Sequence, residues 1–184
     1  MKEFFIFKRR KLSLNIATIK PCDIANGPGV RVSVFVSGCE HHCKECFNQE
    51  AWDFTYGHPM DENDLEFIIT RLGPEYIAGL SMLGGEPLHP NNLKGVKRIL
   101  EAVKRFYKDD KSIWMYSGYT WEELTDSQRE ILKYVDILVD GRFEIAHKVI
   151  DLRFRGSTNQ RIIDVKKSTK DQIVLWEDDS HYYI

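Results

Sequence analysis

The sequence lacks the features that would place it in a membrane or outside the cell. Its 184 residues contain no apolar run near the roughly 18 residues that a membrane span needs. The N-terminus does not resemble a signal peptide, because the basic run 8–11 follows a short apolar stretch instead of preceding it. Four cysteines are too few for a secreted disulfide scaffold. We therefore expect a soluble, cytoplasmic protein without a membrane partner.

An excess of charge of one sign is also missing. The formal net charge is −2 and the pI is about 6.3, so no strong field points to a nucleic acid, and we expect none as a partner. Hydrophobic residues make up 42% of the chain, which is enough for a core. No repeat, low-complexity segment or linker divides the sequence. We expect an N-terminal extension over residues 1–15 and one domain over residues 16–184.

Strand and helix patterns alternate along the chain. Apolar residues recur every three or four positions over 92–107, which is typical of an amphipathic helix, whereas apolar and polar residues alternate over 30–36, as in a strand. The patterns predict strands at 30–36, 77–83, 112–116, 135–139 and 161–165, and helices at 61–72, 92–107, 121–133 and, weakly, 142–150. This order predicts an α/β domain with a parallel sheet and crossover helices.

Four unusual loops each follow a predicted strand. They are Gly38-Cys39, Gly84 to Pro87, Ser117 to Tyr119, and Asp140-Gly141. The carboxyl ends of parallel strands lie side by side, and sites in α/β folds are built there. We therefore expect these four loops to converge in space.

Three of the four cysteines stand in one short segment. Cys39, Cys43 and Cys46 have the spacing C-x3-C-x2-C, and clustering of this kind in a cytosolic chain indicates metal. A [4Fe–4S] cluster usually takes four thiolates, so three leave one iron open for a chelating ligand, such as the amino and carboxylate groups of an amino acid. Cys22 lies outside the segment, and we interpret it as a small buried apolar residue.

Zinc is the alternative occupant of this segment, with His41 or His42 as the fourth ligand. Zinc sites usually have two separated ligand pairs, and the sequence has no second pair. Both histidines are also too close to Cys43 in sequence for easy tetrahedral closure. The cysteines therefore favour the iron–sulfur cluster.

The glycine-rich loop 84–87 follows the strand after the cysteine segment. Gly84 and Gly85 allow close backbone approach to a ligand, and the Glu86 carboxylate suits an ammonium group. Ser117 and Gly118 could bind a ribose or a carboxylate, and Asp140 could act similarly. For these last three residues a structural role is about as well supported as a ligand contact.

Together these residues resemble the radical S-adenosylmethionine superfamily, and in particular the proteins that activate anaerobic ribonucleoside-triphosphate reductases. The resemblance runs from about Ile19 to Val165. It rests on N-G-P-G-V-R (26–31), F-V-S-G-C-E-H-H-C-K-E-C-F-N (35–48), Trp52, L-G-G-E-P-L-H-P-N-N (83–92), W-M-Y-S-G-Y (114–119), Y-V-D-I-L-V-D-G-R-F (134–143) and R-G-S-T-N-Q-R (155–161).

The resemblance implies a shortened, open parallel (β/α) barrel and a cofactor pair. It implies that a [4Fe–4S] cluster on Cys39, Cys43 and Cys46 reductively cleaves S-adenosylmethionine, and that the 5′-deoxyadenosyl radical generates a glycyl radical on the reductase. The implied partners are the large subunit of that reductase and an electron donor such as flavodoxin or ferredoxin. The implied cofactor contacts are Glu45, Cys46, Phe47, Gly84, Gly85, Glu86 and Ser117.

One position departs from the pattern of the superfamily. Many members place an aromatic residue just before the third cysteine to contact the adenine, whereas this sequence has Glu45 there and Phe47 after it. Backbone contact is therefore the expected interaction at this point. Two alternative functions stay open: activation of another glycyl-radical enzyme, and a zinc-bound interaction module.

Overall fold

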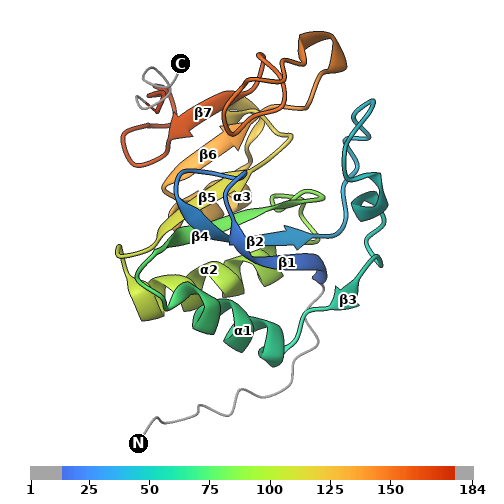
Figure 1. Cartoon of the computed structure of the whole chain (residues 1–184). Coiled ribbons are helices and arrows are strands. Elements are labelled where there is room, and N and C mark those ends of the chain that lie inside the picture. The colour runs from blue at the N-terminus through green and yellow to red at the C-terminus, as the bar shows by residue number, and fades with distance from the viewer. Residues whose placement is uncertain (1–13, 177–184) are drawn as a thin grey trace, which may run out of the picture.

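In residues 14–176, which the computed structural model describes, seven strands form one sheet in the order β3-β1-β2-β4-β5-β6-β7 (Figure 1). The strands are β1 (Asn15–Asp23), β2 (Val30–Val36), β3 (His58–Pro59), β4 (Ile77–Gly84), β5 (Ser112–Tyr116), β6 (Ile137–Asp140) and β7 (Arg161–Asp164). The four central strands β2, β4, β5 and β6 are parallel. The predicted α/β class is therefore confirmed.

The sheet is mixed, which the sequence did not predict. β7, expected as a further parallel strand, pairs antiparallel with β6. β1 was not predicted as a strand; it pairs antiparallel with β2 and its ladder is irregular between Lys20 and Asp23. One side of β1 is largely exposed, so its sequence lacks the apolar character of a central strand. β3 and β7 end the sheet on opposite sides, which leaves it open and not closed into a barrel.

Three α-helices connect the parallel strands within the same described residues: α1 (Glu62–Leu72), α2 (Leu93–Tyr107) and α3 (Asp126–Leu132). α1 begins where predicted, because Asp61 accepts the backbone N–H groups of Asn63 and Asp64 in a capping box. Short 3-10 turns occupy Gln49–Trp52, Trp121–Glu123 and Ile145–His147.

Two helix predictions are wrong in extent. The predicted helix 121–133 is divided, because Thr125 adopts an extended backbone and caps α3 by accepting from Gln128 N. The predicted weak helix 142–150 contains only the 3-10 turn Ile145–His147.

The helices cover one face of the sheet (Figure 1). Their apolar side chains pack with strand residues such as Val34 and Leu80 in the larger core cluster; the helix residues with no exposed surface include Ile68, Leu72, Val96, Ile99, Leu100 and Val103. Burying such a side chain stabilises the fold by about 1.5–3 kcal/mol. Phe106, which the helical pattern placed on the same stripe, is exposed instead.

The N-terminal predictions have mixed outcomes. Residues 1–13 of the expected extension lie outside the described residues, whereas Leu14 is buried and Asn15 begins β1. Cys22, predicted to be buried, is exposed. It lies at the end of β1 that pairs with the beginning of β2, whereas Cys39 follows the other end of β2. A seven-residue strand spans about 20 Å, so Cys22 is remote from the other cysteines.

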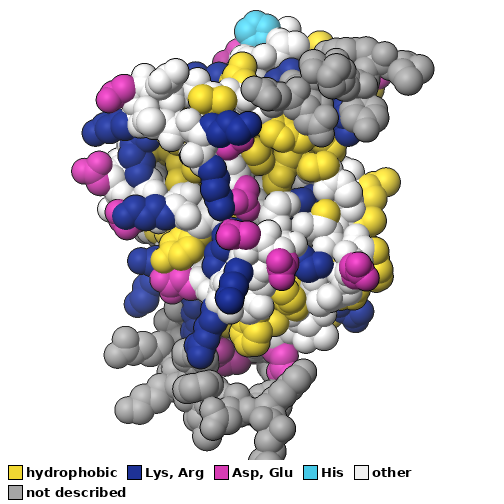
Figure 2. Space-filling view, turned by 90° about the vertical axis from the view of Figure 1, so that its left-hand side faces the viewer, with side chains coloured by type: hydrophobic (Ala, Val, Ile, Leu, Met, Phe, Trp, Pro, Cys, Tyr) yellow, Lys and Arg dark blue, Asp and Glu magenta, His cyan; other side chains and the backbone are white. Residues whose placement is uncertain are grey.

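The surface shown in Figure 2 carries basic and acidic side chains that are interleaved. Ion pairs lie where α2 ends and the parallel strands begin: Lys104 lies 3.5 Å from Asp136, and Lys166 lies 2.9 Å from the same carboxylate. Within residues 14–176, the helices are too short or too polar to cross a bilayer.

Candidate cluster and cofactor site

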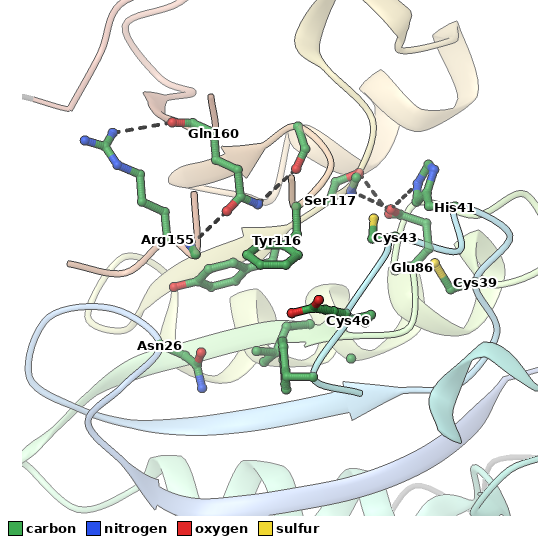
Figure 3. A pocket seen from close by; sticks show the side chains of 18 of the residues that line it. Asn26, Cys39, His41, Cys43, Cys46, Glu86, Tyr116, Ser117, Arg155 and Gln160 are labelled. Carbon is green, nitrogen blue, oxygen red and sulfur yellow. Dashed lines mark hydrogen bonds and ion pairs between the residues drawn. The ribbon is translucent and has the colours of Figure 1, made fainter. Parts of the chain in front are cut away.

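A cavity of about 630 Å³ lies at the carboxyl ends of the parallel strands, on the face without helices (Figure 3). Each of the four predicted loops contributes to its wall, through Cys39, Gly84 to Glu86, Ser117 with Gly118, and Gly141. The predicted convergence of these loops is therefore confirmed. All nine residues predicted to bind the cluster or the cofactor line this one cavity: Cys39, Cys43, Glu45, Cys46, Phe47, Gly84, Gly85, Glu86 and Ser117.

The cysteine segment leaves the end of β2 and curves around one end of the cavity. Its start is fixed by two backbone hydrogen bonds, from Gly38 N to Ala51 O at 2.8 Å and from Cys39 N to Trp52 O at 3.1 Å. His42 and Glu45 adopt positive φ angles of 47° and 58°, which bend the chain between the cysteines. The Cys39 side chain is buried, whereas Cys43 and Cys46 are partly exposed.

The protein by itself disfavours thiolates at this end of the cavity. Burial raises the pKa of Cys39 to about 11, and the nearby Glu86 carboxylate and the other two cysteines act in the same direction. Burial also raises the pKa of Cys43. A bound metal centre supplies the positive charge that would deprotonate these thiols.

The donor set fits a cluster better than a single ion. Among residues 14–176, no three His, Cys, Asp or Glu side chains converge on one ion position. In a cubane the three thiolates bind different irons, so their sulfurs are spread more widely than around one zinc ion. His41 is engaged by Glu86, and His42 packs on Trp52 with ring centroids 4.8 Å apart. The three cysteines line one cavity, as the ligands of a single [4Fe–4S] cluster would have to, whereas His41 and His42 each have a contact elsewhere.

The Glu86 carboxylate, predicted to bind an ammonium group, is fully buried and accepts four hydrogen bonds from the protein itself. One oxygen accepts from Leu88 N at 2.8 Å and from Ser117 Oγ at 2.9 Å. The other accepts from Gly118 N at 2.7 Å and faces His41 Nε2 at 2.8 Å (Figure 3). Glu86 thus joins the loops that follow β2, β4 and β5, and we call this arrangement the Glu86 clamp.

His41 carries the cysteine segment into the Glu86 clamp. Arg142 Nε donates to His41 Nδ1 at 3.2 Å, so the ring is the tautomer with a proton on Nε2, which donates to Glu86. Tyr119 packs edge-on against the ring, at 4.6 Å between centroids. A β-carbon at Gly118 would lie 2.3 Å from the ring, so glycine is required there.

Close packing of the backbone also explains why glycine occupies positions 84 and 85. Gly84 has a φ of +117°, and a β-carbon on it would lie 2.5 Å from the backbone of Val36. A β-carbon on Gly85 would lie 2.6 Å from Gly38 O. The two glycines therefore let the loop after β4 lie directly against the start of the cysteine segment. Their backbone faces the same cavity as the three thiols.

Ser117 and Asp140 both have structural partners. Ser117 Oγ donates to Glu86 and accepts from Tyr119 N at 3.1 Å. Asp140 is buried; it accepts from Trp121 N at 2.7 Å and forms an ion pair with Arg161 at 2.6 Å. These contacts satisfy the Asp140 carboxylate, so its burial needs no ligand to explain it.

No ligand contact was predicted for the residues at the other end of the cavity, away from the cysteines. This end is lined by Asn26, Tyr116, Phe154, Arg155 and Gln160. Gln160 ties the wall together by donating to Gly141 O at 2.9 Å and accepting from Gly156 N at 2.8 Å. Four of the five lie in the motifs 26–31, 114–119 and 155–161. These motifs therefore pointed to this part of the cavity, but they assigned no role to any single residue in it.

The comparisons with known proteins agree with this site. The family model described as a 4Fe-4S single cluster domain matches residues 25–163, which places the chain in the class of single-cluster iron–sulfur proteins. Among curated proteins, the anaerobic ribonucleoside-triphosphate reductase-activating protein of Vibrio cholerae is 44% identical over 151 residues, covering 81% of this chain and 97% of that protein.

The proteins of the same name from Enterobacteria phage T4 and Escherichia coli K12 are 39% and 37% identical, and cover 81% and 80% of this chain. The matches span 93% and 96% of those two proteins. The chain therefore belongs to the family of anaerobic ribonucleoside-triphosphate reductase-activating proteins.

Proposed function

We propose that the chain activates an anaerobic ribonucleoside-triphosphate reductase through a [4Fe–4S] cluster on Cys39, Cys43 and Cys46 and S-adenosylmethionine bound beside it. Together these cofactors supply one-electron cleavage of the sulfonium, which yields methionine and a 5′-deoxyadenosyl radical that takes a hydrogen atom from a glycine of the reductase. In this proposal the open sheet is the shortened (β/α) barrel of radical S-adenosylmethionine enzymes. The electron comes from a donor such as flavodoxin or ferredoxin, in the cytoplasm.

One observation carries the proposal: three cysteines and six further predicted contacts, from three separate loops, line the same cavity. A cluster held by three thiolates leaves one iron free to be chelated. The chain thus provides the donor set that an open cluster needs, next to a cavity of a size typical for cofactor sites.

The chain's own residues hold and orient the two groups. The ammonium of the methionine moiety meets the backbone of Gly84 and Gly85, since the Glu86 carboxylate is engaged by four protein donors. Glu86 and Ser117 act by fixing that backbone relative to the cysteine segment. Glu45 and Phe47 contribute through the backbone beside Cys46, because the Phe47 ring is largely exposed.

Anaerobic reconstitution tests the proposal. We expect about four irons and four sulfides per chain, a brown protein, and release of 5′-deoxyadenosine when dithionite and S-adenosylmethionine are added. Mixing the loaded chain with the reductase should then produce a glycyl radical visible by electron paramagnetic resonance. A colourless protein that binds one zinc ion and takes up no iron would contradict the proposal.

A further inference from the structure

The loop after β6 reaches the cysteine segment through two consecutive residues. Arg142 donates from Nε to His41 Nδ1 at 3.2 Å, across 101 positions of sequence. Burial raises the pKa of Cys43, whereas a hydrogen bond from the Phe143 backbone and the charge of Arg142 act in the opposite direction. Phe143 and Cys43 line the same cavity, and His41 lies at its cysteine end (Figure 3). The loop therefore affects both the position and the charge of the cysteine segment.

The Arg142 guanidinium is also fixed on its other side. One of its terminal nitrogens lies 3.3 Å from Glu123 Oε1, and the two side chains are 44% and 41% exposed. The second oxygen of Glu123 accepts from Thr120 N at 2.8 Å in a capping box, which anchors the carboxylate. The Arg142 carbonyl accepts from the Asn159 side chain at 2.9 Å. The guanidinium is therefore held between an anchored carboxylate and His41.

The other charges at this end of the cavity give Arg142 its importance. Glu86 is fully buried and acts on Cys39 in the same direction as burial, which raises the pKa of that thiol. Glu40 pairs with His89 at 3.2 Å. The charged side chains of the cysteine segment itself are exposed; they are Glu40, Lys44 and Glu45. The buried Glu86 carboxylate would oppose the addition of an electron to a cluster on these thiols, and Arg142 offsets that negative charge.

Reduction of a [4Fe–4S] cluster adds one electron and forms or breaks no bond. In the proposed function that electron comes from a donor of the flavodoxin or ferredoxin type. Positive charge near a cluster and hydrogen bonds to its sulfurs favour the reduced state. Because the Arg142 side chain is partly exposed, water screens its charge, and the expected effect is a few-fold change in the reduction equilibrium.

We propose that Arg142 is a positioning residue for the cluster: it holds His41 in the Glu86 clamp and, as a fixed positive charge beside the cysteine segment, makes the cluster easier to reduce. This proposal rests on the proposed function and deepens it, because it names a group that governs the electron-transfer step. The loop after β6 thereby acts on the cluster although none of the three cysteines lies in it. Glu123 opposes the same effect, since its carboxylate pairs with the guanidinium.

The main test is the midpoint potential of the reconstituted cluster, measured by an anaerobic redox titration followed by electron paramagnetic resonance, without S-adenosylmethionine. Arg142→Met removes the charge and the donors but keeps a long apolar stem. We expect its potential to be more negative, with the reduction equilibrium shifted about threefold or more. Arg142→Lys keeps the charge and a donor and should lie closer to wild type. Arg71→Met is the matched control, because that arginine lies over the Phe67 ring within α1, on the helix side of the sheet.

Glu123→Gln separates an effect of charge from a loss of structure. Glutamine keeps one acceptor oxygen for Arg142 or Thr120 N, but it removes the negative charge that offsets the guanidinium. The potential should therefore become less negative, which is opposite to the shift in Arg142→Met. A purely structural role of Arg142 does not predict opposite signs for the two partners of one ion pair. Thermal melting of each variant shows whether it folds.

A second measurement needs no cluster. In the cluster-free, ¹⁵N-labelled chain, the imidazole nitrogen shifts of His41 should show the proton on Nε2, and Arg142→Met should weaken that preference whereas Arg71→Met should not. Equal potentials in wild type and Arg142→Met, or shifts in the same direction in Arg142→Met and Glu123→Gln, would overturn the proposal. A wild-type chain that takes up no iron would overturn the proposed function and the reduction step with it, whereas the His41 shifts would still decide whether Arg142 holds the ring.

Discussion

The two faces of the sheet differ in how their side chains find partners. On the helix face, α1 and α2 bury aliphatic residues such as Ile68, Ile99 and Leu100 against the strands, and this packing needs nothing from outside the chain. On the cavity face, Cys39, Cys43 and Cys46 line one cavity, and the Tyr116 hydroxyl has no hydrogen-bond partner among residues 14–176. The first face stabilises the fold, and the second carries the cavity of the proposed cofactor site.

The Glu86 clamp does not follow this difference between the two faces. It lies on the cavity side, yet its four acceptor positions are occupied by the protein. These contacts are those of a supporting residue, although the sequence pattern placed Glu86 among the ligand contacts. A residue in a cofactor motif can therefore act by holding the loops that carry the motif.

The largest effect should come from the thiols. Replacing Cys39, Cys43 or Cys46 by Ala should abolish stable cluster binding, because a cubane held by three thiolates has no spare protein ligand. Iron content and 5′-deoxyadenosine release measure this loss. In Cys43→Ala and Cys46→Ala the melting temperature of the cluster-free chain should change little, because both side chains are partly exposed. Retention of four irons by any of the three variants would contradict the assignment.

A substitution on the helix face should lower the stability of the chain but leave cluster binding unchanged. Leu100→Ala removes a side chain with no exposed surface and should lower the free energy of unfolding by about 2–5 kcal/mol. Iron uptake at a temperature where the variant stays folded should equal that of wild type. Urea unfolding and iron content together check this separation, which fails if Leu100→Ala is stable but binds no cluster.

Glu86→Ala tests whether Glu86 supports the fold or contacts the cofactor. The substitution leaves buried donors without an acceptor, so it should destabilise the cluster-free chain by about 1–3 kcal/mol and also weaken S-adenosylmethionine binding. Thermal or urea unfolding of the cluster-free protein measures the first effect. If stability is unchanged and only the affinity falls, Glu86 contacts the ammonium group directly, as the sequence pattern indicated.

Two neighbouring histidines provide a matched control for the clamp. His41→Ala removes the donor that ties the cysteine segment to Glu86, so it should reproduce part of the Glu86→Ala loss. His42→Ala removes a side chain that packs on Trp52 outside the clamp and should have the smaller effect on S-adenosylmethionine affinity. Equal effects of the two substitutions would remove His41 from the clamp.

The smallest effect is expected at Cys22. Because its side chain is exposed and lies at the opposite end of β2 from the cluster segment, Cys22→Ala should leave iron content, 5′-deoxyadenosine release and melting temperature near wild type. Cys22 therefore serves as the control for the other three cysteines. If Cys22→Ala loses iron as fully as they do, the cluster has a fourth thiolate and no open iron.

Much of the fold could be predicted from the sequence, because its signals are local. The capping residue Asp61 and the apolar repeat at 92–107 define α1 and α2 within the chain segment itself. What could not be predicted depends on distant pairing: the antiparallel direction of β7, the exposed position of Cys22 and the break in helix at Thr125. Direction and burial depend on which neighbours a segment packs against.

The site shows the same division between local pattern and distant contacts. The sequence by itself determined the three thiols, the glycine pair and the expectation that loops after parallel strands meet. The tertiary structure alone decided that Glu86 bonds His41, 45 residues away, and Ser117, 31 residues away, and that the Tyr116 hydroxyl is left without a partner among residues 14–176. Hydrogen-bonding capacity is a property of the residue type, whereas the partner that satisfies it is chosen by the packing of the whole chain.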